Sequence, residues 1–156
     1  MNINFTKING NLYKINNQNN IKFTNVIVPF KLQKYYENYY LNIEINHNDK
    51  LNQENIYIYK LLENELYNLE KIEDNNLTNL EFYSNIKTKT YKNNTFDLLR
   101  LQIKKSKNSF ITKYKNGTLF EIEPNKKYNC EIEINTIWIS KNKYGFNINL
   151  INLENN

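Results

Sequence analysis

The last thirty residues of the chain alternate between apolar and polar side chains with the period of a β-strand. Over residues 128–139 the even positions are mainly apolar, while the odd positions open with asparagine and glutamate, which is typical of a strand with one buried face. After a polar turn at 140–145, the alternation resumes over residues 146–153. The segment predicts a long terminal β-hairpin, with Gly145 free to adopt a positive φ in the turn.

Earlier parts of the chain show the same alternation in shorter segments. It predicts strands at 21–32 and 39–45, and further strands at 80–86, 95–104, 110–115 and 118–122. The Asn116-Gly117 pair between the last two is a strong signal for a type I′ hairpin turn. The chain is therefore expected to be strand-dominated.

One segment changes period. Over residues 50–74 apolar residues recur at steps of three, four and seven, which predicts a single amphipathic helix. Asn48 or Asn52 is expected to cap its start. The glutamates between the apolar positions are expected to face solvent: Glu63, Glu65 and Glu70.

Together these elements predict a mainly β (α+β) fold in one domain, residues 1–156. So many strands would expose unpaired edges, which an antiparallel barrel with long hairpins and one packed amphipathic helix at about 50–74 removes. We place the barrel core at about residues 21–153 and expect residues 1–20 to be peripheral.

The residues that usually carry catalysis are scarce. Cys130 and His47 are the only residues of their types, and the three glycines form no phosphate-binding loop, so we expect no catalytic residue, no metal site and no cofactor. Cys130 is interpreted as a small buried side chain and His47 as structural. The chain is expected not to be an enzyme.

No apolar segment of the chain is close to the length of about 20 residues that a membrane-spanning helix needs. The first residues also lack the basic start and apolar core of a signal peptide. We therefore expect an intracellular protein that does not contact membranes.

Charge is concentrated in one part of the chain. Residues 82–116 contain nine Lys or Arg and one Asp or Glu, whereas the preceding residues 48–81 are acidic. Cations interleaved with aromatic rings suit single-stranded nucleic acid, because lysines track phosphates and rings stack on bases. The predicted nucleic-acid-binding residues are Lys87, Lys89, Tyr91, Lys92, Arg100, Lys104, Lys105, Lys107, Phe110, Lys113, Tyr114 and Lys115.

Four further aromatic residues could extend the stacking surface: Tyr36, Tyr39, Tyr40 and Trp138. The alternative for each tyrosine is half-buried packing with a solvated hydroxyl. Trp138 shares the even-numbered face with Ile132 and Ile134, which favours a buried core ring over a stacking role.

Several segments together resemble the single-stranded DNA-binding proteins of large DNA viruses and phages. They are residues 55–63 on the helix, Phe82-Tyr-Ser-Asn-Ile86, residues 96–103, and the strand that reaches Ile137-Trp138, followed by a polar turn and Tyr144-Gly145. The resemblance covers roughly residues 26–153. It implies an oligonucleotide/oligosaccharide-binding (OB) fold that coats exposed single strands in viral-type DNA replication or recombination, without cofactor or catalysis.

Further expectations follow from this resemblance. The main partner is single-stranded DNA, with RNA as the alternative, and replication proteins or a second copy are further candidates. A viral protein of this kind works where viral DNA is replicated, in the nucleus or the cytoplasm of the host cell. The competing interpretation is a non-enzymatic structural or protein-interaction β-barrel module, such as a virion or assembly protein, whose lysines are merely solvated.

Overall fold

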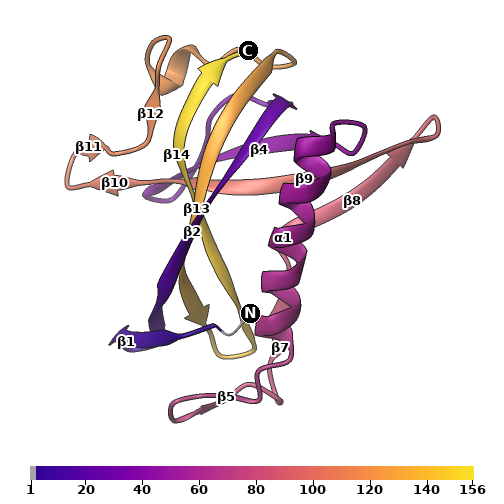
Figure 1. Cartoon of the computed structure of the whole chain (residues 1–156). Coiled ribbons are helices and arrows are strands. Elements are labelled where there is room, and N and C mark those ends of the chain that lie inside the picture. Colours follow the sequence, from indigo (N-terminus) through magenta and orange to yellow (C-terminus); the bar gives the residue numbers. More distant parts are fainter. Residues whose placement is uncertain (1–2) are drawn as a thin grey trace.

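The terminal hairpin is present as the alternation predicts. Strand β13, Lys127–Ile139, pairs antiparallel with β14, Lys143–Asn155, over nearly its whole length. Figure 1 shows the two strands side by side near the C-terminus, in orange and yellow. The computed structural model describes residues 3–156, and of residues 17–19 the backbone alone.

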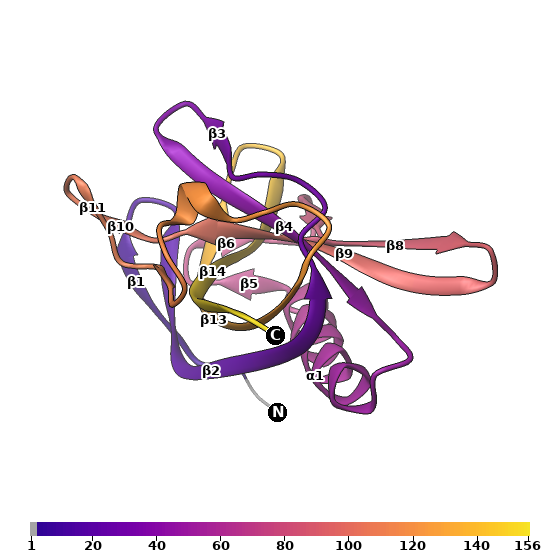
Figure 2. The same ribbon diagram turned by 90° about the horizontal axis from the view of Figure 1, so that it is seen from above.

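The hairpin belongs to a closed ring of five strands. β2, Leu12–Ile27, pairs with β13 on one side and with β4, Asn38–Asn46, on the other. β4 pairs with β9, Asn94–Ile103, and β9 pairs with β14, which closes the ring. Only the β9–β14 contact within the ring is parallel. Figure 2 shows these strands from above. The mainly β fold with one helix is confirmed, and its sheet is barrel-like.

Smaller elements surround the ring. β3 extends β4 as a hairpin, and β8 does the same for β9, so that the β8–β9 hairpin projects to one side (Figures 1 and 2). The smaller elements are β1 (Phe5–Asn9), β3 (Gln33–Tyr35), β5 (Lys71–Ile72), β6 (Asn75–Asn76), β7 (Glu81–Tyr83), β8 (Ile86–Tyr91), β10 (Lys105–Ser106), β11 (Ser109–Phe110), β12 (Lys113–Tyr114) and the 3₁₀ helix η1 (Leu119–Glu121).

The interior of the ring is apolar because one face of each strand carries aliphatic or aromatic side chains. Leu41 and Ile43 of β4 lie opposite Leu101 and Leu99 of β9, and all four are fully buried. Burying a side chain of this size contributes about 1.5–3 kcal/mol. Since successive residues of a strand point to opposite faces, the residues between them are presented on the outside of the ring.

The barrel core begins earlier than residue 21. Residues 12–20 belong to β2, and this part of the strand pairs with β13, where Tyr13 lies opposite Ile137. Tyr13 is fully buried and Ile15 nearly so. The prediction that residues 1–20 are peripheral is therefore wrong for this segment, whose run of asparagines conceals its strand period. Residues 1 and 2 lie outside the described part.

The helix α1, Lys50–Tyr67, lies alongside the ring next to β2 and β4 (Figure 1). Its cap is Asp49, whose carboxylate accepts a hydrogen bond from the Asn52 backbone N–H at 3.1 Å. Neither predicted cap, Asn48 or Asn52, is correct. The buried Asn52 side chain instead accepts from the Thr24 N–H at 3.0 Å and donates to the Thr24 carbonyl at 2.6 Å, which fastens the helix to β2.

The helix also ends before residue 74 and buries one of its glutamates. After Tyr67 the chain turns into the small β5–β6 hairpin, from which Ile72 reaches the core. The position of Ile72 in the sequence therefore fits the helical period, although Ile72 lies outside the helix. Glu63 is buried rather than solvent-facing, whereas Glu65 is half-buried and Glu70 is exposed.

The predicted hairpin at Asn116-Gly117 is wrong. β12 pairs with β14 in parallel, and residues 119–121 form η1 rather than a strand. A tight hairpin turn lies instead earlier in the chain, at Lys92 and Asn93, which both have positive φ and join β8 to β9. Asparagine tolerates this backbone conformation better than most residues do.

Candidate functional site

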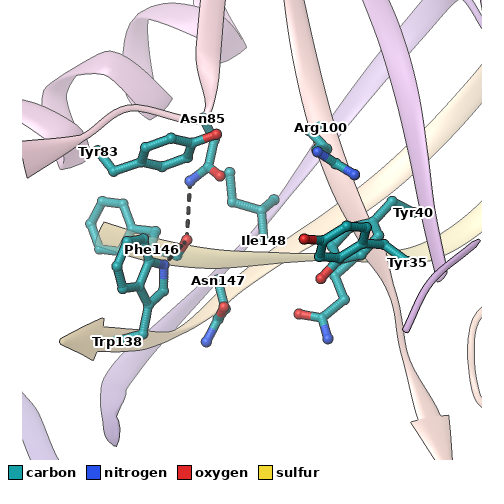
Figure 3. Close-up of a pocket in the computed structure, with 10 residues that line it drawn as sticks. Tyr35, Tyr40, Tyr83, Asn85, Arg100, Trp138, Phe146, Asn147 and Ile148 are labelled. Atoms are coloured by element: carbon teal, nitrogen blue, oxygen red, sulfur yellow. Dashed lines mark hydrogen bonds between the residues drawn. The ribbon is translucent and has the colours of Figure 1, made fainter. Parts of the chain in front are cut away.

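An open pocket of about 330 Å³ lies on the outside of the ring, where β4, β9, β13 and β14 meet the segment around β7. Figure 3 shows its side chains gathered from segments that are far apart in the sequence. Its lining contains four aromatic rings besides the buried Phe146, three amides, one cation and no carboxylate: Tyr35, Tyr40, Tyr83, Asn85, Arg100, Gln102, Trp138, Phe146, Asn147 and Ile148.

Strand alternation places a cation beside a ring at one end of the pocket. Leu99 and Leu101 point into the core, so Arg100 of β9 points outward, as does Tyr40 of β4. The guanidinium carbon of Arg100 lies 4.4 Å from the centroid of the Tyr40 ring, within cation–π range. The exposed guanidinium keeps donors available to a bound anion.

Trp138 lines the other end of the pocket, which overturns its predicted core position. A β-bulge between Ile134 and Thr136 shifts the alternation, so Ile137 and Ile139 are buried while Trp138 is half-buried on the outer face. Its indole N–H donates to the Phe146 carbonyl at 3.1 Å. The sequence prediction assumed an uninterrupted period through the bulge.

Gly145 gives the indole its space. It lies opposite Trp138 in β14, and it does not have the positive φ that the sequence suggests. A Cβ at this position would lie 2.8 Å from the Tyr83 carbonyl oxygen and 3.1 Å from the nearest atom of the indole ring. Glycine is therefore needed here for close approach.

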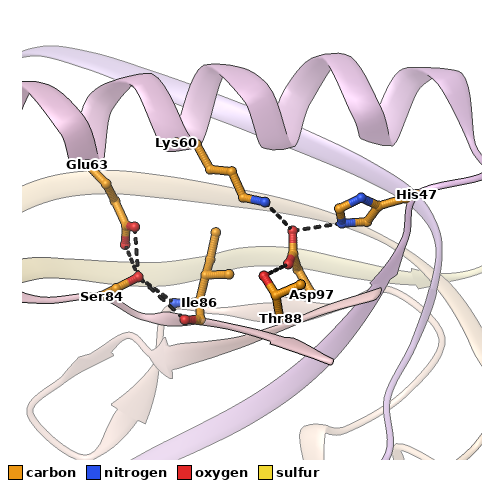
Figure 4. Close-up of polar contacts among 7 residues, drawn as sticks. All are labelled: His47, Lys60, Glu63, Ser84, Ile86, Thr88 and Asp97. Carbon is orange, nitrogen blue, oxygen red and sulfur yellow. Dashed lines mark hydrogen bonds and ion pairs between the residues drawn. The ribbon is translucent and has the colours of Figure 1, made fainter. Parts of the chain in front are cut away.

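A buried carboxylate positions the Tyr83 side of the pocket. Glu63 of α1 accepts a hydrogen bond from the Ser84 hydroxyl at 2.7 Å (Figure 4). It accepts another from the Asn85 N–H at 3.2 Å. The Asn85 amide then donates to the Phe146 carbonyl at 3.0 Å. Tyr83, next to this anchored segment, holds its ring centroid 5.9 Å from that of Trp138.

The outer face continues from the pocket along the β8–β9 hairpin. Lys87 lies opposite Leu98, and Lys89 lies opposite Phe96, so both lysines share the face of Arg100. Farther along this face, Tyr91 is exposed near the hairpin tip, where the Lys92 ammonium lies 5.3 Å from its ring centroid. We call this surface, made of Lys87, Lys89, Tyr91 and Lys92, the basic arm.

The other predicted residues lie at the opposite end of β9. Lys104 is paired with Glu133, and Lys115 with Glu154, both at 2.7 Å. Tyr114 is half-buried, and its hydroxyl donates to Asn155. Lys105, Lys107, Phe110 and Lys113 lie on or beside the short strands β10, β11 and β12, away from the basic arm (Figure 1). The twelve predicted residues therefore do not form one surface.

The three tyrosines of the first hairpin lie on different sides of it. Tyr40 lines the pocket, whereas its neighbour Tyr39 points to the other face and packs against Phe110 at 5.2 Å between centroids. Tyr36 is highly exposed in the turn and contacts Tyr35, a pocket residue that the sequence analysis missed. Tyr35 precedes Tyr36 at the same turn, and this position is the sequence signal that could have identified it.

The single histidine belongs to a polar cluster between α1 and the β8–β9 hairpin. Asp97, whose side chain is fully buried, accepts hydrogen bonds from Lys60 at 3.0 Å, from His47 at 2.8 Å and from Thr88 (Figure 4). Burial by itself would raise the pKa of the Asp97 carboxyl, but these three donors outweigh it, so the pKa lies below its ordinary value. The cluster fastens the basic arm to the helix.

Other reactive groups have no comparable setting. Burial raises the pKa of the Cys130 thiol to about 12, so the thiol stays protonated at neutral pH. Within residues 3–156, no three His, Cys, Asp or Glu side chains gather as metal ligands would. The described part also contains no helix with the length and apolar character needed to cross a membrane.

Comparisons with known proteins do not identify the chain. No protein-family model matches it, and neither a curated protein nor a solved structure does. The pocket, the basic arm and the strand order are therefore the observations on which a function can be based.

Proposed function

We propose that the chain binds single-stranded nucleic acid, primarily DNA, without sequence specificity, across the outer face of β4, β9 and β8. The observation that carries this proposal is the pocket: Trp138, Tyr83 and the Tyr40–Arg100 pair surround an open space lined by no carboxylate. Exposed rings stack on bases at about 1–3 kcal/mol per base. The role is to coat exposed strands in viral-type DNA replication or recombination, with no cofactor and no catalysis.

The strand order supports an OB-like barrel. In chain order the five ring strands are β2, β4, β9, β13 and β14. The first strand, β2, pairs with the second, β4, and with the fourth, β13, while the third, β9, runs parallel to the fifth, β14. OB folds are five-stranded Greek-key barrels that bind oligonucleotides on the second and third strands and on the loops after the first and fourth. The pocket lies over the equivalent strands, β4 and β9. Tyr35, from the connection between β2 and β4, lines one part of it, and Trp138, beside the loop between β13 and β14, lines another.

The basic arm supplies the phosphate contacts of this proposal. Lys87 and Lys89 share the outer face with Arg100, and each lysine that neutralises a phosphate of a single strand releases about 0.7 of a counterion. Lysines along the arm and rings in the pocket form the combination of cationic track and stacking platform that single-stranded nucleic acid requires.

The intrinsic fluorescence of Trp138 tests the proposal directly, because it is the only tryptophan and lines the pocket. Oligo-dT should quench it, duplex DNA of the same length should bind more weakly, and affinity should fall steeply with salt. Changing Trp138 to Ala should weaken binding by about 1–3 kcal/mol, measured by anisotropy of a labelled oligonucleotide. Equal affinity for duplex, or no quenching at low salt, contradicts the proposal.

A pair of charge variants tests the path along the arm. Lys87→Gln with Lys89→Gln should reduce the salt slope by about 0.7 per lysine. The matched control is Lys50→Gln with Lys71→Gln, which makes the same change on α1 and β5, neither of which contributes a residue to the pocket. If both pairs reduce the slope equally, the attraction is diffuse and the arm is not the binding track.

The second candidate is a protein-interaction module, favoured by one observation. The outer side of α1 exposes several large apolar residues, among them Tyr57, Leu61 and Tyr67, and exposed apolar patches mark interaction surfaces. A chain that self-associates through α1 and shows no oligo-dT quenching would support this alternative over nucleic-acid binding. Analytical ultracentrifugation of the protein and of Leu61→Glu distinguishes the two.

A further inference from the structure

A second aromatic cluster lies on the far side of the β3–β4 hairpin from the pocket. Tyr39 of β4, Phe110 of β11 and Phe120 of η1 form a triangle with ring centroids 5.2, 5.9 and 6.0 Å apart. Three separate elements of the chain, β4, β11 and η1, therefore converge on one group of rings, which we call the distal cluster.

Phe120 is held outward by its own helix. Leu119 and Ile122, on either side of it, are buried, while Phe120 is 63% exposed. The helix is fixed by a capping box in which the Glu121 carboxylate accepts the Thr118 N–H at 2.6 Å. The exposed ring is thus presented by an anchored element and supported at its edge by Tyr39 and Phe110.

Two lysines flank these rings. The ammonium groups of Lys34 and Lys105 lie 5.6 and 5.4 Å from the centroid of Tyr39. Lys105 donates to the backbone carbonyl of Glu37 at 2.8 Å, not to a carboxylate, so its charge is not neutralised by that contact. In contrast, Lys104, the adjacent residue, is paired with Glu133.

The distal cluster is connected to the pocket through the hairpin. Tyr39 and Tyr40 are adjacent in β4 and point to opposite faces, one into each site. At the turn between the sites Tyr35 and Tyr36 are 62% and 79% exposed, with ring centroids 4.6 Å apart. The exposed rings of Tyr35 and Tyr36 therefore lie at the end of the hairpin whose two faces carry the pocket and the distal cluster.

We propose that the distal cluster is a second stacking subsite for the same nucleic acid strand, which leaves the pocket, crosses the end of the β3–β4 hairpin and stacks bases on Phe120 while Lys34 and Lys105 contact its phosphates. This inference rests on the proposed function and goes beyond it, because it predicts that affinity depends on strand length in two steps. Rings flanked by cations match a strand of bases and phosphates.

Oligo-dT of about 4 and of about 16 nucleotides, the limits of known OB-fold site sizes, separate the two subsites. Quenching of Trp138 reports occupancy of the pocket for both. Phe120→Ala should weaken binding of the long oligonucleotide about tenfold, the loss of one stacked base, and leave the short one unchanged. Lys105→Gln should do the same in low salt. The matched control is Tyr57→Ala, an aromatic residue of α1 that is also 63% exposed.

The outcomes distinguish this inference from the proposed function. If pocket variants weaken the long oligonucleotide while Phe120→Ala and Lys105→Gln do not, the second subsite is wrong and the pocket stands. If Phe120→Ala weakens the short and the long oligonucleotides equally, the cluster is not a separate subsite. If neither oligonucleotide quenches Trp138, the proposed function itself fails.

Discussion

Replacing Asp97 by Asn tests whether the polar cluster under α1 stabilises the fold. The carboxylate accepts hydrogen bonds from Lys60, His47 and Thr88, and hydrogen bonds to charged groups contribute about 1.5–3 kcal/mol each. The Lys60 and His47 side chains are 43% and 29% exposed, so water replaces part of what they lose. Asn also keeps one acceptor oxygen and buries no charge. We therefore expect a net loss of about 2–3 kcal/mol in the free energy of unfolding.

The effect should depend on pH in a defined direction. The pKa of Asp97 is lower in the folded protein than its ordinary value near 3.9. Its stabilisation is thus complete above about pH 4 and is lost as the pH falls through the folded pKa. The difference between wild type and Asp97→Asn should therefore be present in full at pH 7 and shrink in strong acid.

Urea denaturation at pH 7 and below pH 4 measures both effects. The midpoint of Asp97→Asn should fall at pH 7 with an unchanged m-value. Asp74→Asn is the matched control, because it makes the same change at an exposed residue and should alter stability by less than about 0.5 kcal/mol. A loss at pH 7 no larger than that of the control, or one that grows in acid, would refute the reasoning.

Two other substitutions test the pocket. Gly145→Ala should force the Tyr83 carbonyl and the indole of Trp138 apart, shifting the tryptophan emission maximum and weakening oligo-dT binding; unchanged emission and affinity would mean that the space is not constrained. Glu63→Gln should lower stability by about 1–3 kcal/mol, because one oxygen that accepts from Ser84 becomes a donor. We also expect Glu63→Gln to bind oligo-dT more weakly while it is folded, as checked by circular dichroism at the titration temperature. Normal binding by the folded variant would show that Glu63 does not position Asn85.

Strand periodicity allowed much of the barrel-like sheet to be predicted. The terminal hairpin, β4 and β9 alternate because each has one face in the core, and their pairing follows from that burial. Residues 12–20 escaped prediction because asparagines interrupt the pattern. Ile72 matched a helical repeat because it reaches the same core from a hairpin, and spacing alone does not distinguish the two.

The site was predicted only in part, for three physical reasons. The bulge before Thr136 reverses the side to which Trp138 points, and no residue in the strand signals it. Charge along the sequence does not show that Lys104 and Lys115 are paired with glutamates from β13 and β14. Tyr83 and Asn85 enter the pocket through a tertiary contact with Glu63, which the helical period assigned to solvent.

The close approach at Gly145 offers a way to recognise other chains that carry this pocket. An indole before the turn of the last hairpin requires the facing position after the turn to have no side chain, because the Tyr83 carbonyl occupies the remaining space. This requirement depends on the approach of the Gly145 backbone to the Tyr83 carbonyl and the indole, not on the identity of more distant side chains. A tryptophan and a glycine in register across a terminal hairpin therefore form a signature for detecting distant relatives.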